Sequence, residues 1–351
     1  MTASTTTADQ LAPEVSEASR RALRIARVRG IVLAALGVFA LQLAAGTLDS
    51  PAAFSFWLAE QGGDALTLTP TIGFLWLLAG AVTGVAGLWQ LWRGLRVSWR
   101  RWLALVLPLW IAATMAALLQ GKAANLTGVF AGSLELATPI AMGAFAALIC
   151  ERSGMLNIAI EGKLLLGACV ASIVASVTGL VILGPVAAAL AGMGVGLLLA
   201  WLGIRWKVDQ IISGTVVNIG ALGLTNFLFL RILQNQTELN TPPTISTIEV
   251  PLLSSIPVLG PILFSGTPYL YIALATMVIL TYMLFRTRWG LRLRASGEYP
   301  QAAGTVGIDV IRIRYRAMLL AGLLAGFAGS YLSLASAGSF QMKMSAGKGF
   351  I

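Results

Sequence analysis

The chain has 351 residues, of which 57% are apolar and only 11% charged, and its formal net charge is +10. Because a soluble domain has about 25% charged residues, this composition argues against a soluble enzyme and favours a protein of the lipid bilayer. Histidine is absent, which removes the usual general base and the commonest metal ligand. Cys150 and Cys169 form no metal-binding or disulfide pattern. We therefore assign no catalytic residue and no metal ligand.

The N-terminal part combines a polar tail with three apolar runs. Its first nineteen residues are rich in Thr, Ser, Ala and acidic residues and contain no signal-peptide core, so residues 1–29 are expected to be a disordered cytoplasmic tail. A spanning helix needs about 20 mostly apolar residues. Residues 30–125 contain three such runs, which predict three membrane spans: Gly30–Leu48, Thr71–Leu91 and Trp102–Gly121.

Six further spans are predicted in residues 126–351. The stretch from 164 to 204 is uncharged and too long for one span, so the break at Gly179–Pro185 divides it into two helices. The segment Gln234–Pro268, rich in Thr, Pro and Ser, is expected to be an ordered external loop. The fold class is therefore all-α, a polytopic transmembrane bundle of about nine spans, with the other four predicted at Leu126–Cys150, Ile211–Phe229, Tyr269–Phe285 and Ala317–Leu334.

Lys and Arg residues are concentrated in alternate connections between these spans. They gather before the first span, between the second and third, between the sixth and seventh, and over Arg286–Arg316. The connections 49–70, 121–125 and 234–268 together contain a single Lys and no Arg. By the positive-inside rule, this predicts a multi-pass membrane protein with a cytoplasmic N-terminus. Membrane orientation and lipid contact explain the positive charge, so no nucleic-acid partner is expected.

Between two apolar runs lies the segment CERSGMLNIAIEGKLLLGA, residues 150–168. Its polar residues, set between two apolar runs, predict a broken helix near 151–163. Irregular backbone at membrane depth survives only where protein buries it or where it lines a water-filled cavity, and ionisable groups there usually mark a transport pathway. Glu151 and Arg152 can pair with each other, and Asn157 and Glu161, one turn apart on one face, would present a polar stripe to a lumen or to a neighbouring helix. A plain interfacial loop is the alternative, in which Glu161 only caps the helix or pairs with Lys163. Glu135 is expected at the outer membrane interface.

A second polar segment, Arg286–Arg316, precedes the last predicted span. A large positive-inside loop would explain its arginines, but its uncharged centre suits a short helix that begins at Pro300 and ends at Gly307. Such a helix, exposed to the cytoplasm, is a plausible docking element for a partner protein.

Three motifs occur in order along the chain. They are ERSG (151–154) with Asn157-Ile158, Glu161-Gly162 and Gly167-Ala168; IISG (211–214) with Asn218 and ALGL (221–224); and Gly297-Glu298, Pro300, Ala302-Ala303 and Gly307-Ile308. Together they resemble the motifs of permease subunits of ABC importers for nucleosides and simple sugars, within the branched-chain amino acid and ribose-type family of binding-protein-dependent permeases. Lys163 stands where that family usually has an apolar residue or glutamine, and Ala159 where glycine is frequent.

The resemblance implies that residues 126–351 form a permease core truncated at its C-terminus, since the chain stops at GKGFI (347–351). It implies a subunit of the plasma membrane that works with cytoplasmic ATP-binding subunits, a second permease subunit and an external substrate-binding lipoprotein. It also implies that ATP and Mg belong to the partner ATPase, so that this chain holds no cofactor. The implied translocation pathway contains Glu151, Arg152, Ser153, Asn157, Glu161 and Asn218, and the implied ATPase-coupling segment contains Gly297, Glu298, Pro300, Ala302, Ala303, Gly307 and Ile308.

The competing hypothesis is a secondary transporter driven by an ion gradient. In that case Glu151, Arg152 and Glu161 would form a proton or sodium relay for a small polar solute.

Overall fold

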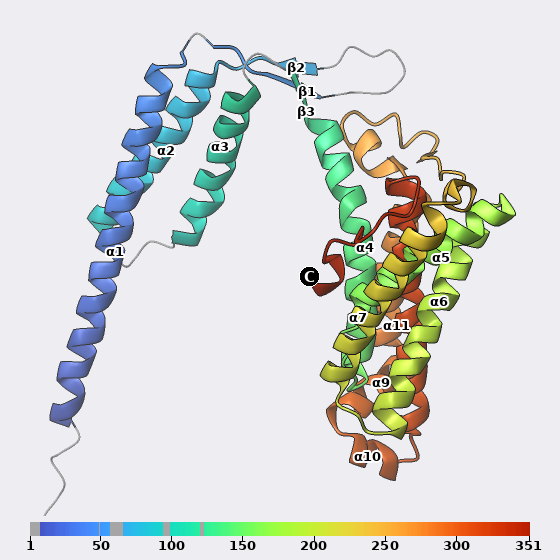
Figure 1. Cartoon of the computed structure of the whole chain (residues 1–351). Helices are drawn as coiled ribbons and strands as arrows, with labels where there is room; N and C mark the ends of the chain where they lie inside the picture. The colour runs from blue at the N-terminus through green and yellow to red at the C-terminus, as the bar shows by residue number, and fades with distance from the viewer. Residues whose placement is uncertain (1–7, 49, 57–65, 94–98, 120–122) are drawn as a thin grey trace, which may run out of the picture. The chain divides into compact units, whose positions relative to one another are not determined.

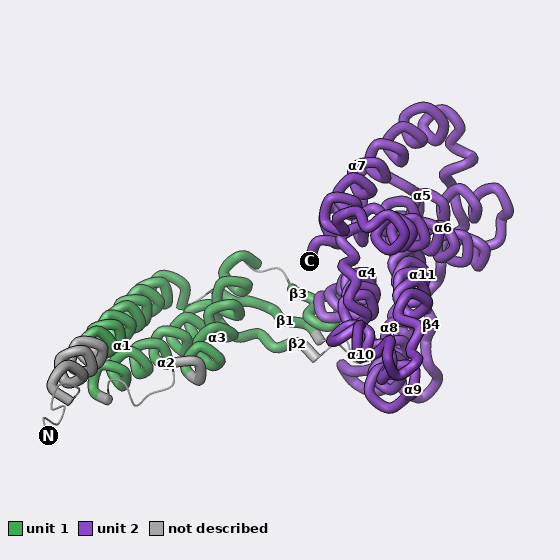
Figure 2. Tube along the Cα trace, turned by 90° about the horizontal axis from the view of Figure 1, so that it is seen from below, with its two compact units in different colours: residues 1–127 green, residues 128–351 purple. Residues whose placement is uncertain are grey.

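The computed structural model of the protein describes residues 8–48, 50–56, 66–93, 99–119 and 123–351. The chain divides into two compact units, Met1–Thr127 and Gly128–Ile351 (Figure 2). Within the described residues, nine helices are long and apolar enough to cross a membrane. The predicted all-α polytopic bundle is therefore confirmed.

Unit 1 contains three long helices and a small sheet. Trp76 of α2 meets Trp110 of α3 edge to face, and the Trp110 indole N–H donates to Thr83 Oγ1 (2.9 Å). In the sheet, β1 is central, antiparallel to β2 and parallel to β3. The elements are α1 (Ala8–Ala45), β1 (Ala53–Phe56), β2 (Leu66–Leu68), α2 (Ile72–Arg93), α3 (Trp99–Leu119) and β3 (Ala123–Asn125).

The tail expected to be disordered over residues 1–29 is helical from Ala8, because α1 extends without interruption from Ala8 to Ala45. The physical reason is composition: residues 16–28 (SEASRRALRIARV) consist mainly of Ala, Arg, Leu and Glu, which favour helix. Residues 1–7 lie outside the described part of the chain.

Unit 2 carries six of the candidate spans (Figure 1). Asp209 caps α7 by accepting hydrogen bonds from the N–H groups of Ile211 and Ile212 (2.8 and 3.1 Å). The spanning helices are α4 (Leu126–Arg152), α5 (Ile160–Thr178), α6 (Leu183–Ala200), α7 (Gln210–Leu228), α8 (Pro268–Arg286) and α11 (Val310–Tyr331), and π-helical turns extend α6, α7 and α11 at Trp201–Arg205, Phe229–Leu233 and Leu332–Ser336.

The last span begins earlier than Ala317, the start expected from its apolar run. Asp309 accepts a hydrogen bond from the Arg312 N–H (2.9 Å) and thereby caps α11 at Val310. Arginines 312, 314 and 316 consequently lie inside the helix. A cap residue, and not the edge of the apolar run, determines where this helix starts.

Two polar regions lie at opposite ends of unit 2 (Figure 1). One holds α9 (Arg288–Glu298), which the sequence analysis did not predict, and α10 (Pro300–Thr305), which it did. The other holds the ordered connection between α7 and α8. That connection contains a 3-10 turn (Thr237–Asn240), a π-helical turn (Gly260–Phe264) and two paired short strands, β4 (Ile248–Glu249) and β5 (Ser265–Gly266).

The core of unit 2 is built where α11 packs against α5 and α6 with their backbones almost touching. A Cβ atom added at Gly192 of α6 would lie 2.6 Å from Gly326 Cα and 2.7 Å from its nitrogen. Gly167 of α5 likewise faces the Gly326 backbone. Lipid is as apolar as the helices themselves, so small residues that allow close packing are what hold such helices together.

Replacing Gly192 with valine is expected to destabilise unit 2 by more than the 1–3 kcal/mol typical of overpacking, because the obstructing atoms belong to backbone. Gly194 provides the matched control: it lies on the same helix, and a Cβ there meets no atom within 4 Å in the described part of the chain. Thermal unfolding in detergent measures the effect. Equal midpoints for Gly192→Val and Gly194→Val would contradict the packing argument.

Candidate functional site

The predicted helix break lies between α4 and α5. The Gly154 N–H donates to the Glu151 carbonyl (3.0 Å) and the Met155 N–H donates to the Cys150 carbonyl (3.0 Å). This pair of bonds is the Schellman motif that ends a helix, and it requires a left-handed residue. Gly154 supplies that residue, with φ of +77°. The chain then runs without helical structure until α5 begins at Ile160.

The start of α5 is capped from another helix. Ala159, at the N-cap position, has no side chain that can accept a hydrogen bond. Asn218 of α7 does this instead: its Oδ1 accepts from the Gly162 N–H (2.7 Å) while its Nδ2 donates to the Ile158 carbonyl (2.9 Å). One buried amide therefore satisfies backbone on both sides of the α5 start and ties the break to α7.

Replacing Asn218 with leucine is expected to leave the Gly162 N–H and the Ile158 carbonyl without partners. Each unsatisfied buried group costs about 1–3 kcal/mol, so the thermal midpoint and substrate uptake should both fall. Asn235→Leu is the control, because Asn235 is exposed and, among the described residues, its side-chain amide donates only to the Arg231 carbonyl, four residues earlier. A midpoint for Asn218→Leu equal to that of Asn235→Leu would rule out this capping role.

Asn157 and Glu161 do not share a helical face, so that expectation is wrong. The cause is the non-helical backbone after Gly154, which places Asn157 before α5 begins. Asn157 Oδ1 accepts a hydrogen bond from Nζ of Lys163 (2.6 Å), a side chain with 0% exposure. Among the residues that the structure describes, the buried Nδ2 of Asn157 has no hydrogen-bond partner.

Glu161 binds the C-terminal segment, residues 337–351. Its Oε1 accepts from Ser345 Oγ (2.5 Å) and from the Gly347 N–H (2.9 Å), and its Oε2 accepts from the Gly349 N–H (2.7 Å). Glu161 therefore neither pairs with Lys163 nor caps its own helix. The three donors lie more than 180 residues further along the chain. Sequence reasoning missed them because they are one hydroxyl and two backbone N–H groups, which no charge pattern identifies. The cation of this stretch, Lys348, donates instead to the Ser345 carbonyl (3.4 Å).

The turn at the end of α4, Arg152–Gly154, contacts α9 and α11. A Cβ atom on Gly297 would lie 2.5 Å from the Arg152 carbonyl oxygen and 3.0 Å from the Gly154 nitrogen. Nε of Arg314 donates to the Ser153 carbonyl (3.3 Å). The predicted coupling segment and the predicted pathway motif are therefore in direct contact.

The predicted pathway residues separate into two groups. Ser153, Asn157, Glu161 and Asn218 are buried. Glu151 and Arg152 are exposed and, with Arg294, Gly297 and Glu298, line a surface pocket of about 340 Å³. No ion pair joins Glu151 to Arg152 in the described part of the chain.

The predicted coupling segment forms a compact turn around α10. Pro300 occupies the first turn of this helix, and Gly307, with φ of +80°, follows its end. The Ile308 N–H donates to the carbonyl of the buried Ala303 (3.0 Å). Gly297, Pro300 and Ile308 are half-buried, whereas Glu298, Ala302 and Gly307 are exposed.

Glu135, expected at the outer interface, is half-buried and fastens α4 to the start of α8. Its Oε1 accepts from the Thr267 N–H (2.5 Å) and its Oε2 from Thr267 Oγ1 (2.7 Å). This carboxylate therefore holds two spans together at the end of unit 2 opposite α10.

Comparison with known proteins places these features among membrane transport subunits. The family described as "Branched-chain amino acid transport system / permease component" matches residues 134–351. A nucleoside ABC transporter permease protein, NupC of Lactococcus lactis, is 37% identical over 231 residues, 64% of this chain and 72% of the relative. A guanosine ABC transporter permease protein, NupQ of Bacillus subtilis, is 34% identical over 226 residues, 62% of this chain and 71% of the relative.

A putative glucose ABC transporter permease protein, TsgC13 of Haloferax volcanii, is 33% identical over 224 residues, 64% of this chain and 68% of the relative. No solved structure matches the chain.

Proposed function

The chain belongs to the family of branched-chain amino acid transport system permease components, and from this premise we propose that it is the permease subunit of an ATP-driven ABC importer for a nucleoside or a related simple sugar. The observation that carries the proposal is its similarity to nucleoside, guanosine and glucose permeases over about two thirds or more of their lengths. We propose a nucleoside as the preferred substrate class. Of the three relatives described above, the two named for nucleosides are 37% and 34% identical to this chain, and the glucose permease is 33% identical.

The proposed assembly contains a second permease subunit, two cytoplasmic ATP-binding subunits and an external substrate-binding lipoprotein. ATP and Mg would bind the ATPase chains, and this chain would contribute the pathway. In this arrangement the α10 end of unit 2 faces the cytoplasm, together with the N-terminus. The arginines in α9 and at the start of α11 support this orientation under the positive-inside rule.

The contacts at the helix break suggest how ATPase movement reaches the pathway. A push on the coupling segment would act through Gly297 on the Arg152–Gly154 turn, and through Arg314 on Ser153. From this turn the chain continues into α5. Asn218 of α7 holds the start of α5 through the Gly162 N–H, and Glu161 of α5 holds the C-terminal segment. A short irregular segment held at both sides is suited to a hinge, because a few residues at the ends of elements absorb the change in backbone angles.

Uptake of labelled guanosine, ribose, glucose and leucine tests the proposal in cells expressing the full-length protein with its partner subunits. We expect guanosine or a sugar to accumulate, to stop accumulating when ATP is depleted, and to be unaffected by an ionophore. Uptake that survives ATP depletion and collapses with the ionophore would support the ion-gradient carrier instead. Accumulation of leucine alone would overturn the substrate class.

A further inference from the structure

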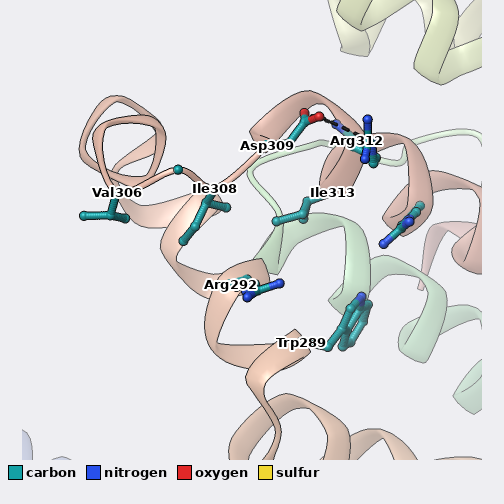
Figure 3. Close-up of a pocket in the computed structure, with 9 residues that line it drawn as sticks. Trp289, Arg292, Val306, Ile308, Asp309, Arg312 and Ile313 are labelled. Atoms are coloured by element: carbon teal, nitrogen blue, oxygen red, sulfur yellow. Dashed lines mark hydrogen bonds and ion pairs between the residues drawn. The ribbon is translucent and has the colours of Figure 1, made fainter.

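A basic pocket lies between α9 and the start of α11. It has a volume of about 380 Å³. Figure 3 shows Trp289 and Arg292 of α9 on one side of it and Asp309, Arg312 and Ile313 on the other. Val306, Gly307, Ile308 and Arg316 complete the lining.

The pocket is positively charged and only partly neutralised. Arg312 Nε lies 3.3 Å from Asp309 Oδ2, but both side chains are more than half exposed, so this ion pair is weak. Arg292 and Arg316 are also exposed, and in the described residues neither has a carboxylate within ion-pair distance. Guanidinium groups bind phosphate through two parallel hydrogen bonds. A phosphate anion therefore fits the charge and the chemistry of this pocket.

The position of the pocket points to the membrane boundary. α8 ends at Arg286, a few residues before Trp289, and α11 enters the candidate span at Val310. Arg316 lies six residues inside that span, about 9 Å along the helix axis at 1.5 Å per residue. An exposed arginine at this depth extends its charged end towards the headgroup layer.

Apolar side chains lie beside the arginines. Trp289 and Ile308 are half-buried and Ile313 is buried, and all three line the same pocket. Tryptophan is enriched at the headgroup level of membranes. A ligand with an anionic phosphate and an adjoining apolar part matches both halves of the lining better than free phosphate, which uses only the charged half.

We propose that this pocket binds the headgroup of an anionic phospholipid. Arg292, Arg316 and Arg312 contact the phosphate, and Trp289 and Ile313 contact the adjoining apolar part of the lipid. Basic pockets between spanning helices bind lipid headgroups in this manner. The site is distinct from the pathway residues at the helix break.

The test uses the full-length protein in detergent with added phosphatidylglycerol, phosphatidylcholine or inorganic phosphate, and counts bound lipid by native mass spectrometry. An arginine near an anionic membrane surface contributes about fivefold in affinity. We therefore expect the double variant R292Q/R316Q to lower phosphatidylglycerol retention by about 25-fold relative to phosphatidylcholine. The matched control is R286Q/R288Q, which removes two exposed arginines of the same region that do not line the pocket.

Selective loss in R292Q/R316Q, with retention kept in R286Q/R288Q, supports the proposal. Equal loss in both double variants would overturn it, because the effect would then come from general surface charge. Inorganic phosphate that displaces phosphatidylglycerol at equal concentration would also overturn it, in favour of a phosphate site. Retention unchanged in R292Q/R316Q would exclude the pocket as the lipid site.

Discussion

Replacing Gly297 with alanine is expected to reduce ATP-driven uptake by about 5- to 150-fold, the range that corresponds to a coupling free energy of about 1–3 kcal/mol. The added Cβ would lie 2.5 Å from the Arg152 carbonyl oxygen and 3.0 Å from the Gly154 nitrogen. Both obstructing atoms belong to backbone, which cannot rotate away as a side chain can. The turn that ends α4 must therefore move, and the proposed link between the coupling segment and the break is disturbed at its point of closest contact.

The measurement combines labelled uptake with ATP hydrolysis and co-purification of the ATPase subunits. We expect Gly297→Ala to keep the ATPase bound and active while transport falls, since α10 itself is unchanged. Gly304→Ala is the control: it adds the same methyl group within α10, where a Cβ meets no described residue within 4 Å. Normal uptake by Gly297→Ala, or an equal loss in both variants, would contradict a role for this contact in transmission.

Much of the architecture could be predicted because it depends on local composition. Each span is an apolar run whose length matches a bilayer, so nine spans were expected and nine candidate helices are found in the described residues. The helix break was predictable for the same reason, since charged residues interrupted an apolar pattern. The end of α4 at a glycine and the start of α10 at Pro300 follow from backbone preferences that belong to single residue types.

The partners of the polar residues could not be predicted, because they come from distant parts of the chain. Asn218 lies 56 residues from the Gly162 N–H that it satisfies. Spacing suggested a shared face for Asn157 and Glu161, but spacing applies only within a continuous helix. Once the backbone leaves the helix at Gly154, neighbouring side chains point to different partners: Asn157 to Lys163 and Glu161 to the C-terminal segment.

The contact between Gly297 and the Arg152–Gly154 turn could not be predicted from the sequence either. A glycine in a polar segment has many uses, and nothing local distinguishes close approach from flexibility. Only the packing of α9 against the end of α4 shows that a side chain has no room there. Two motifs that were separate predictions thereby become one connected site.

Replacing Glu161 with glutamine is expected to release the C-terminal segment and to reduce uptake by about 10- to 150-fold. The carboxylate accepts three hydrogen bonds, from Ser345 Oγ and from the N–H groups of Gly347 and Gly349, and it offers acceptors on both oxygens. A glutamine has one acceptor oxygen and one donor group, so at least one of these donors would face another donor. A hydrogen bond to a charged group is worth about 1.5–3 kcal/mol, which gives the stated range.

Hydrogen exchange of the Gly347 and Gly349 amides measures the release directly, because local opening exposes N–H groups that the carboxylate now holds. Exchange at these amides should accelerate by the same factor by which the contact weakens, whether or not transport is assayed. Glu238→Gln is the control, since Glu238 is exposed in the connection between α7 and α8 and undergoes the same chemical change. Unchanged exchange in Glu161→Gln would show that the segment is held by other contacts. Faster exchange with normal uptake would separate the anchoring of this segment from the transport cycle.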